Sequence, residues 1–343
     1  MTMTNEKTAN NPTYDVVVIG AGAGGLNAAL VLARSRRRVA VVDAGQPRNA
    51  PAPHMHGFLS RDGMAPRDLL AAGRAELTSY GVDLIASQAQ RIDRIVHIDR
   101  TEHIEHIEHT EEATPHLQVR LAGGPVLDAR HVVVATGLRD HLPDIPGVRE
   151  RWGTDLLFCP YCHAYEVRDQ PIGVLGTHPA AVGHTLLLRQ WSEDIVYFAH
   201  TQQPGEEDRE RLTARGVRIV EGTVKRLVVE NDRLRGVELT EGRVVLRSAV
   251  FVVPTMVPRD DLLTGLGCAK DDNGWVVTDR AGRTSVPGVW AVGNVIDPRA
   301  MVVTAAGMGA AAAFALNQEL VNDDISRAVA HHRTAAALPP LAR

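Results

Sequence analysis

The stretch YDVVVIGAGAGG at residues 14–25 decides the fold class, because an apolar run there leads directly into closely spaced glycines. We predict a buried parallel strand before the glycines and a helix over residues 26–33. Gly20 permits the tight turn, Gly22 lets a pyrophosphate approach the backbone, and Gly25 lets helix and strand pack closely. The stretch therefore predicts a doubly wound α/β fold of the Rossmann type.

The next predicted strand, residues 38–42, ends at Asp43. An acidic residue at this distance from the glycines accepts hydrogen bonds from the ribose hydroxyls of an adenosine. A glycine-rich loop that served packing alone would leave Asp43 without an explanation. Strand, glycines, helix, strand and acid in this order predict a dinucleotide site.

Composition indicates a globular protein of one large or two smaller domains. The chain has 343 residues, of which 44% are hydrophobic and 23% charged, and its formal net charge is −4. With no broad basic field and only 4% aromatic residues, we expect neither a nucleic acid nor a membrane as partner. Residues 1–13 are polar and are interpreted as a disordered tail, not a signal peptide. Three cysteines do not make a secreted disulfide scaffold, so we expect a cytoplasmic protein.

Cys159-Pro160-Tyr161-Cys162-His163 lies between two glycine-rich strand-to-helix turns. Two cysteines at this spacing form either a reversible dithiol–disulfide pair or half of a metal site. A zinc site would need a second Cys/His pair at ligand spacing, and none follows, so we favour the redox pair and assign no metal. Pro160 favours the first turn of a helix, whose positive end lowers the pKa of a thiol placed there.

Later segments carry a family resemblance. A predicted strand at 131–134 leads to Thr136 and Gly137, another at 288–292 leads to Gly293 and Asn294, and an alanine-rich helix opens at Thr304 and Ala305. Over residues 14–320 the chain resembles the FAD-dependent pyridine nucleotide–disulfide oxidoreductases, and within them the low-molecular-weight thioredoxin reductases. The resemblance implies two Rossmann-like, three-layer domains and a non-covalently bound FAD.

By this resemblance, the residues that bind FAD share places in the family's glycine turns and helix starts, and they are Gly20, Gly22, Gly25, Asp43, Thr136, Gly137, Gly293, Asn294, Thr304 and Ala305. The first four would hold the ADP half of FAD. Gly293 and Asn294 would hold the ribityl chain and pyrophosphate, and Asn294 departs from the family's aspartate although an amide still bonds a hydroxyl. The helix start at Thr304 would point N–H groups at the flavin's pyrimidine edge.

The second glycine turn departs from the family's pattern. A thioredoxin reductase would carry its NADPH fingerprint after the predicted strand 171–175, but His178 stands where the pyrophosphate needs a glycine. The acids Glu206–Asp208 stand where thioredoxin reductases usually carry arginines for the 2′-phosphate. We predict that productive NADPH binding is lost. The alternative is that Arg209 or Arg211 folds back and NADPH binds more weakly.

The run CPYCH at 159–163, followed by Tyr165-Glu166, resembles one branch of this superfamily, the gliotoxin- and holomycin-type dithiol oxidases. Thioredoxin reductases normally have an aspartate after the second cysteine, so His163 favours the oxidase branch. Ala164 replaces the branch's glycine, and we expect it to tighten or reshape the pocket beside the cysteines. The segment 48–59 also resembles that branch and is expected near the flavin.

The resemblance implies a mechanism. His163, whose reference pKa lies near working pH, takes a proton from a substrate dithiol. The thiolate attacks Cys159, which gives a mixed disulfide and releases Cys162 as the charge-transfer thiol against the flavin C4a. The second substrate thiol closes the product disulfide, and electrons pass through FAD to oxygen with release of hydrogen peroxide. The residues alone would allow the two cysteines to exchange roles.

Two other functions stay open. One is an NADPH- or ferredoxin-dependent reductase that sends electrons toward thioredoxin or a small disulfide, and bleaching of the flavin by NADPH would identify it. The other is a redox-sensing or partner-binding flavoprotein, which a slow rate with every dithiol would identify. No motif names the dithiol.

We predict an FAD-binding domain made of residues 14–138 and 250–322, and an inserted NAD(P)-binding-like domain at 139–249 that carries the cysteine pair. Residues 323–343 are a predicted C-terminal tail. In relatives the inserted domain rotates to move the cysteines. Without a nicotinamide to admit, we expect a fixed cysteine–flavin geometry. The resemblance also implies a homodimer.

Several further residues receive no primary role in the chemistry. The Glu-His-Ile repeat at 102–109 could chelate a metal if it were helical, but its flanks are predicted strands, so we interpret it as a surface hairpin extension. His54 and His56 lie near the cofactor or serve the structure. Cys268 is interpreted as a small buried hydrophobe.

Overall fold

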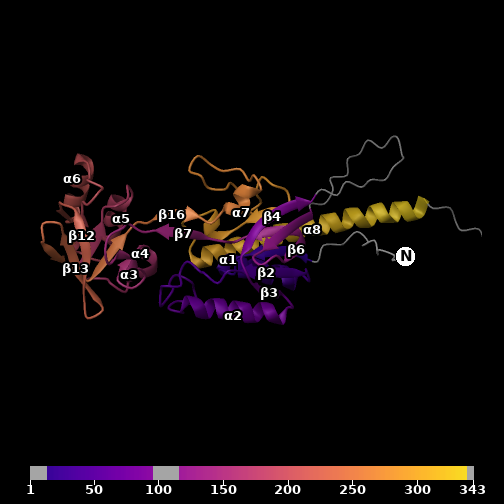
Figure 1. Cartoon of the computed structure of the whole chain (residues 1–343), viewed down its shortest axis with the longest axis horizontal. Coiled ribbons are helices and arrows are strands. Elements are labelled where there is room, and N and C mark those ends of the chain that lie inside the picture. Colours follow the sequence, from indigo (N-terminus) through magenta and orange to yellow (C-terminus); the bar gives the residue numbers. More distant parts are fainter. Residues whose placement is uncertain (1–13, 96–115, 338–343) are drawn as a thin grey trace, which may run out of the picture. The chain divides into compact units, whose positions relative to one another are not determined.

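The computed structural model describes residues 14–95 and 116–337, and the chain divides into two compact units (Figure 1). Within the described residues, the first unit comprises 14–47, 70–95, 116–138 and 258–337, and the second comprises 48–69 and 139–257. Each unit has its own sheet with at least four parallel strands and its own buried core. The predicted α/β class with two Rossmann-like sheets is confirmed.

The first unit is built on a seven-stranded sheet in the order β3-β2-β1-β6-β5-β4, with β17 paired to β6. Its strands are β1 (Tyr14–Ile19), β2 (Val39–Asp43), β3 (Asp83–Ala86), β4 (Ala89–Ile95), β5 (His116–Leu121), β6 (Val126–Val134) and β17 (Val289–Ala291). β1 runs parallel to β2 and β6, whereas β5 is antiparallel to both its neighbours. Val16, Val17 and Val18 are completely buried, as expected for a parallel strand covered on both faces.

The helical elements of the first unit are α1 (Ala23–Arg34), α2 (Pro66–Ser79), α7 (Asp261–Gly265), the short 3-10 helix η1 (Gly293–Val295) and α8 (Val302–Ala337). α1 and α8 pack side by side. Asn27 of α1 donates a hydrogen bond of 2.6 Å to the Ala306 carbonyl of α8. The beginning of α8 is therefore fixed beside the glycine turn that opens α1.

α8 continues to Ala337, so most of the stretch 323–343 that we predicted as a tail is helical. Arg130, with 5% of its surface exposed, donates to Asp324 of α8 at 2.9 Å and to Asp15 of β1 at 3.4 Å. Alanine and arginine in the last turns favour helix formation. The polar composition of this stretch favours a tail, and no pattern in the sequence indicates that Arg130 binds it to the sheet.

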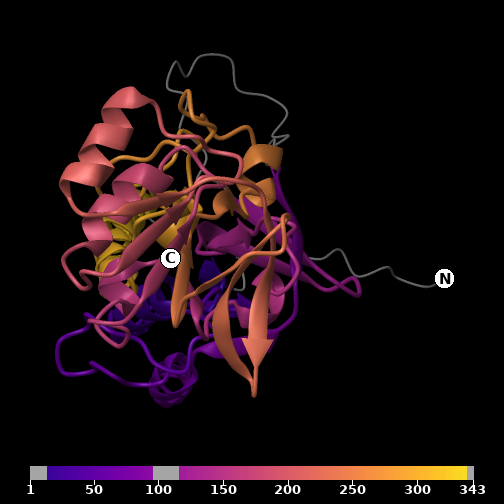
Figure 2. The same ribbon diagram turned by 90° about the vertical axis from the view of Figure 1, so that its left-hand side faces the viewer.

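The second unit has a five-stranded parallel sheet in the order β11-β10-β9-β15-β8 and a three-stranded antiparallel sheet in the order β12-β13-β14. Its strands are β8 (Leu156–Leu157), β9 (Ile172–Leu175), β10 (Ile195–Phe198), β11 (Arg218–Val220), β12 (Val224–Glu230), β13 (Arg233–Leu239), β14 (Val244–Leu246) and β15 (Ala249–Val252). Its helices are α3 (Val148–Arg151), α4 (Pro160–His163), α5 (Ala181–Leu188) and α6 (Glu206–Ala214). In Figure 2 this unit faces the viewer. Tyr197, Phe198 and Phe251 are the largest side chains of its core.

The chain passes between the units in β7 (Leu138–His141) and β16 (Thr255–Pro258), which pair as a two-stranded sheet. The first crossing lies at the predicted boundary. The return comes later than predicted, because β15 pairs with β9 and β8 inside the second unit. The segment 48–69 also groups with the second unit. The assignment of the units to FAD and to a nicotinamide nucleotide stays a prediction.

Two smaller expectations concern buried and apolar residues. Cys268 is 7% exposed and packs in the apolar core, where burial raises the pKa of its thiol, as expected of a small buried hydrophobe. Within residues 14–95 and 116–337, no helix combines the length and apolar character needed to cross a membrane. The repeat at 102–109 and the segment 1–13 lie outside the described residues.

Candidate active site

The first glycine turn has the geometry of a phosphate-binding loop. Gly20 adopts φ +105°, which favours glycine, and a Cβ on Gly25 would lie 1.9 Å from the Gly20 carbonyl oxygen. A Cβ on Gly22 would meet no atom within 4 Å. The turn therefore requires bare backbone at Gly20 and Gly25, whereas Gly22 faces open space that a pyrophosphate could enter.

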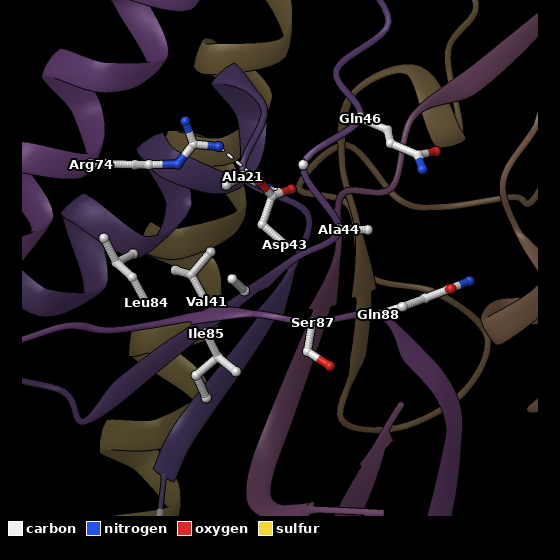
Figure 3. Close-up of a pocket in the computed structure, with 12 residues that line it drawn as sticks. Ala21, Val41, Asp43, Ala44, Gln46, Arg74, Leu84, Ile85, Ser87 and Gln88 are labelled. Carbon is white, nitrogen blue, oxygen red and sulfur yellow. Dashed lines mark hydrogen bonds and ion pairs between the residues drawn. The ribbon is translucent and has the colours of Figure 1, made fainter. Parts of the chain in front are cut away.

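Beside this turn lies a cavity of about 550 Å³ (Figure 3). The residues that line it come from β2, β3, α2 and the loops after the strands, and they are Ala21, Val41, Asp43, Ala44, Gly45, Gln46, Arg74, Leu84, Ile85, Ala86, Ser87 and Gln88. Figure 3 shows the apolar side chains of Val41, Leu84 and Ile85 gathered together. A flat apolar ring could lie on this surface, with the polar side chains at its rim.

Asp43 is held by contacts on both carboxylate oxygens. Oδ1 accepts the Ala21 N–H at 3.1 Å, and Oδ2 pairs with the Arg74 guanidinium of α2 at 2.7 Å. Each carboxylate oxygen has a second lone pair, so both can also accept a ribose hydroxyl. The open backbone at Gly22, the fixed carboxylate of Asp43 and the apolar wall fit the adenosine diphosphate end of FAD.

Thr136 and Gly137 follow β6 and hold the chain that returns from the second unit. The Thr136 hydroxyl donates to the Arg259 carbonyl at 2.6 Å, and the Gly137 carbonyl accepts the Arg259 N–H at 2.9 Å. Gly137 adopts φ +72°. The predicted cofactor role of these two residues therefore coincides with a structural one, because they fix the loop after β6.

Asn294 replaces an aspartate of the family, and the structure gives a reason. Its amide nitrogen donates to the Asp297 carbonyl at 2.9 Å and to the Ala300 carbonyl at 3.0 Å. A carboxylate could donate neither bond. Asn294 thus holds the turn 297–300 that leads into α8.

The first turn of α8 contains Thr304 and Ala305. The Ala305 N–H already bonds the Met301 carbonyl at 2.8 Å, so the predicted contact to a flavin would come from N–H groups earlier in this turn. The first N–H groups of a helix lack acceptors within the helix and favour an anion or a carbonyl. This end of α8 fits the pyrimidine edge of a flavin.

Cys159 and Cys162 form a disulfide, with 5.2 Å between their Cα atoms. Cys159 is the N-cap of α4 and Pro160 its first residue, as the sequence predicted. The Cys159 carbonyl accepts the N–H of Cys162 at 3.2 Å and that of His163 at 3.1 Å. Because α4 is a single turn, its end acts on the thiol pKa more weakly than a long helix would.

His163 stands next to the disulfide and is half-buried. Burial lowers the pKa of its imidazole, the charge of Glu166 raises it, and His56 lowers it. A neutral imidazole can accept a proton from a thiol. The lowered pKa of His163 agrees with the role of base, which stays a prediction.

Aromatic residues flank the cysteine pair along the chain. Phe158, immediately before Cys159, stacks on the ring of His184 at 5.7 Å between centroids, and His184 also lies 6.0 Å from the Phe251 ring. Tyr161 and Tyr165 are 64% and 62% exposed, which leaves an aromatic surface beside the disulfide. Ala164, by contrast, is completely buried in the core, and its effect on the pocket beside the cysteines stays a prediction.

In the second glycine turn, the His178 side chain accepts a backbone N–H group of the turn. His178 Nδ1 accepts the Ala180 N–H at 3.1 Å, the His178 carbonyl accepts the Ala181 N–H at 2.9 Å, and Pro179 has no N–H. The Gly176 carbonyl accepts the N–H groups of Thr201 and Gln202 at 3.0 and 2.8 Å. The N–H groups of Ala180 and Ala181 at this helix start, which could otherwise bind a pyrophosphate, thus already have acceptors.

The acids predicted to repel a 2′-phosphate form the first turn of α6, where negative charge stabilises the helix end. Arg209 bonds Glu221 at 2.6 Å, and Arg211 bonds Asp208 at 3.0 Å. Both arginines therefore have carboxylate partners, which weakens the alternative in which one of them turns to a nucleotide.

Some site residues escaped sequence analysis. Arg74 lies in the middle of an ordinary amphipathic helix, and no spacing relates it to Asp43. His184 lies in a short apolar helix, where a histidine carries no motif. The sequence leaves His56 with two alternatives, a place near the cofactor or a structural role, because no spacing relates residues 48–69 to Glu166.

Comparison with known proteins agrees with this geometry. The family model described as pyridine nucleotide-disulphide oxidoreductase matches residues 14–310. The chain belongs to the pyridine nucleotide-disulphide oxidoreductase family. Members of this family are flavoproteins that bind FAD.

Within the pyridine nucleotide-disulphide oxidoreductases, the crystal structure of HlmI shares 63% identity with this chain, covers 94% of it and 98% of HlmI, and superposes with a TM-score of 0.89. An oxidoreductase of Agrobacterium tumefaciens shares 31% identity over 90% of this chain and 98% of that one, with a TM-score of 0.79. Thioredoxin reductase sirT of Leptosphaeria maculans is 28% identical over 91% of this chain and 96% of its own. The predicted thioredoxin reductase architecture is confirmed.

Proposed function

We propose that this oxidoreductase is an FAD-dependent dithiol oxidase that converts a small-molecule dithiol into a disulfide. The observation that carries the proposal is the Cys159–Cys162 disulfide with His163 on the same helical turn. An oxidised pair beside a neutral imidazole accepts electrons from a dithiol. The exposed rings of Tyr161 and Tyr165 offer apolar surface to a small organic substrate.

In the proposed reaction His163 takes the proton of one substrate thiol. The thiolate attacks Cys159, the bond between Cys159 and Cys162 breaks, and Cys162 leaves as a thiolate. The second substrate thiol, after losing its proton, attacks the substrate sulfur of the mixed disulfide and releases Cys159. Two electrons and two protons have then left the substrate, and the pair is reduced.

FAD would be held at its adenosine end by Gly20, Gly22, Gly25 and Asp43. The remaining contacts would come from the segments that carry Thr136, Gly137, Gly293, Asn294, Thr304 and Ala305. Bound FAD supplies the two-electron acceptor that reoxidises the cysteine pair and passes the electrons to oxygen, which gives hydrogen peroxide. The three cysteines would place the protein in the cytoplasm, and the family resemblance implies a homodimer.

We propose that NADPH takes no productive part. Two features support this proposal: His178 accepts the N–H groups of Ala180 and Ala181 at the start of α5, and the first turn of α6 is acidic. The second candidate function is a thioredoxin-disulfide reductase, which the name of the relative sirT favours. That function would need electrons from a nicotinamide or ferredoxin donor.

Oxygen uptake tests the proposal. Wild-type protein loaded with FAD should consume oxygen and release hydrogen peroxide when a dithiol such as dithiothreitol is added. Cys159→Ser and Cys162→Ser should reduce both rates to background, whereas Cys268→Ala, a buried cysteine outside the pair, should leave them unchanged. Equal oxygen uptake by wild type and both pair variants would reject the proposed role of the disulfide.

A further inference from the structure

A second histidine approaches the cysteine pair from a distant part of the chain. His56 Nε2 lies 3.5 Å from Glu166 Oε1, and Glu166 follows His163 by three residues in the turn after α4. Residues three apart in a helical turn share a face. His163, Glu166 and His56 thus form a line of titratable groups that begins beside the disulfide.

The loop around His56 fixes the position of its ring. The Asp62 carboxylate contacts the ring: its Oδ2 lies 3.3 Å from His56 Nδ1. Its Oδ1 accepts the Gly57 N–H at 2.8 Å, which fixes the carboxylate to the same loop. Backbone hydrogen bonds join the two ends of the loop. The Met55 N–H donates to the Met64 carbonyl, and the Met55 carbonyl accepts the Gly63 N–H, both at 2.9 Å. The ring has carboxylates on both nitrogens and little freedom to turn away.

The segment that carries His56 is itself anchored to the second unit. Arg48 makes a bidentate ion pair with Asp140, at 2.7 and 2.8 Å. Pro51 packs so closely on Gly153 that a Cβ at Gly153 would lie 2.8 Å from the Pro51 Cβ. These contacts stabilise the segment that brings His56 close to Glu166. The contact between His56 and Glu166 is therefore supported by the surrounding structure.

The charges in this line act on His163 in opposite directions. After burial, which lowers the pKa of His163 most, Glu166 raises it and His56 lowers it. Asp62 faces His56 from its own loop, and the Arg168 guanidinium lies over the Tyr165 ring at 4.1 Å. Because His56 shares the Glu166 carboxylate, it weakens the effect of that carboxylate on His163.

We propose that Glu166 and His56 are positioning residues that set the basicity of His163 during dithiol oxidation. The inference rests on the proposed function. In the step concerned, the S–H bond of the substrate breaks, an N–H bond forms on His163, and no electrons leave the substrate. Glu166 stabilises the imidazolium that results, and His56 keeps that stabilisation small enough for the proton to leave again.

The direct test is an NMR titration of the His163 imidazole, assigned by its loss in His163→Gln. Glu166→Gln should lower the midpoint, and His56→Gln should raise it, each by about half a pH unit for partly exposed charges. His54→Gln, on the same loop, and Glu193→Gln, an exposed acid of the same unit, should leave the midpoint unchanged. Shifts of the same sign in both test variants, or no shift in either, would overturn the inference.

The kinetic test follows flavin reduction by dithiothreitol in anaerobic stopped flow at different pH values. The rate should rise with pH as His163 loses its proton, and this rise should move to lower pH in Glu166→Gln and to higher pH in His56→Gln. If wild type is not reduced by the dithiol, the proposed function fails. If wild type is reduced but the variants keep its pH profile, the inference alone fails.

Discussion

His178 accepts the backbone N–H of Ala180 at 3.1 Å, and so caps the helix start where a second dinucleotide would bind. A glycine at this position would leave the N–H group to a phosphate. The His178 side chain thus occupies the place of the glycine and also accepts the N–H bond that a phosphate would accept. We propose that this contact hinders the binding of a nicotinamide nucleotide although the Rossmann sheet is retained.

His178→Gly should therefore gain affinity for a nicotinamide nucleotide. We expect binding to tighten by about tenfold, since a hydrogen bond to a charged group contributes about 1.5 kcal/mol or more. NADH should gain more than NADPH, because the acids at the start of α6 oppose the 2′-phosphate. Calorimetric titration of the FAD-loaded protein measures both. Ala180→Gly, which keeps the His178 contact, is the control, and an equal gain in that variant would refute the role of the cap.

Arg74→Ala should weaken FAD binding. The variant loses the 2.7 Å ion pair that orients Asp43 in the adenosine cavity. We expect the dissociation constant of FAD to rise roughly tenfold, which corresponds to a loss of about 1.4 kcal/mol of binding free energy. The recovery of flavin fluorescence on dilution measures the release. Arg67→Ala, an exposed residue of the same helix, serves as control, and identical FAD affinity in the two variants would contradict this account.

Asn294→Asp restores the residue expected for the family but should destabilise this chain. The carboxylate cannot donate the bonds to the Asp297 and Ala300 carbonyls. Lost bonds of this kind lower the free energy of unfolding by about 1–3 kcal/mol. Urea unfolding of the variant and of wild type measures this difference in the free energy of unfolding. In the control, Asn317→Asp, the changed side chain accepts a bond from Arg37, so a carboxylate should be tolerated there. A stability of Asn294→Asp equal to wild type would disprove the structural reason.

His184 should make stability depend on pH. Burial lowers its pKa to about 4 in the folded protein, against about 6.5 when unfolded. The unfolded state therefore binds more protons between these values, and stability falls as pH drops from 6.5 toward 4. Between pH 7 and pH 5 the loss is about 2 kcal/mol for this one group.

His184→Phe, which keeps an aromatic ring between Phe158 and Phe251, should remove that part of the pH dependence. Urea unfolding at pH 7 and pH 5 compares the variant with wild type. His332→Phe, at an exposed position of α8, is the control. A pH dependence in His184→Phe as steep as that of wild type would show that His184 does not carry the effect.

Patterns of neighbouring residues in the sequence predict the fold and part of the candidate site. The apolar run before Gly20 and the position of Pro160 at the start of α4 each describe a contact within one strand or helix start, and Asp43 lies at a fixed spacing from the glycine turn. Such contacts depend on neighbours along the chain, so the sequence alone predicts them.

Contacts between distant segments could not be predicted in this way. The pairing of Arg74 with Asp43, the approach of His56 to Glu166, and the anchoring of α8 by Arg130 all join residues that no spacing relates. The return boundary was placed too early for a similar reason, because β15 is as apolar as a strand of either sheet. Only the strand pairing decides to which unit it belongs.

The measurement that tests the central claim most directly is anaerobic absorbance of the FAD-loaded protein after addition of NADPH and, separately, of a small dithiol. The account predicts that the dithiol bleaches the flavin and that NADPH does not. Rapid bleaching by NADPH would contradict it, because electrons would then enter through the turn that His178 closes, and the protein would be a reductase.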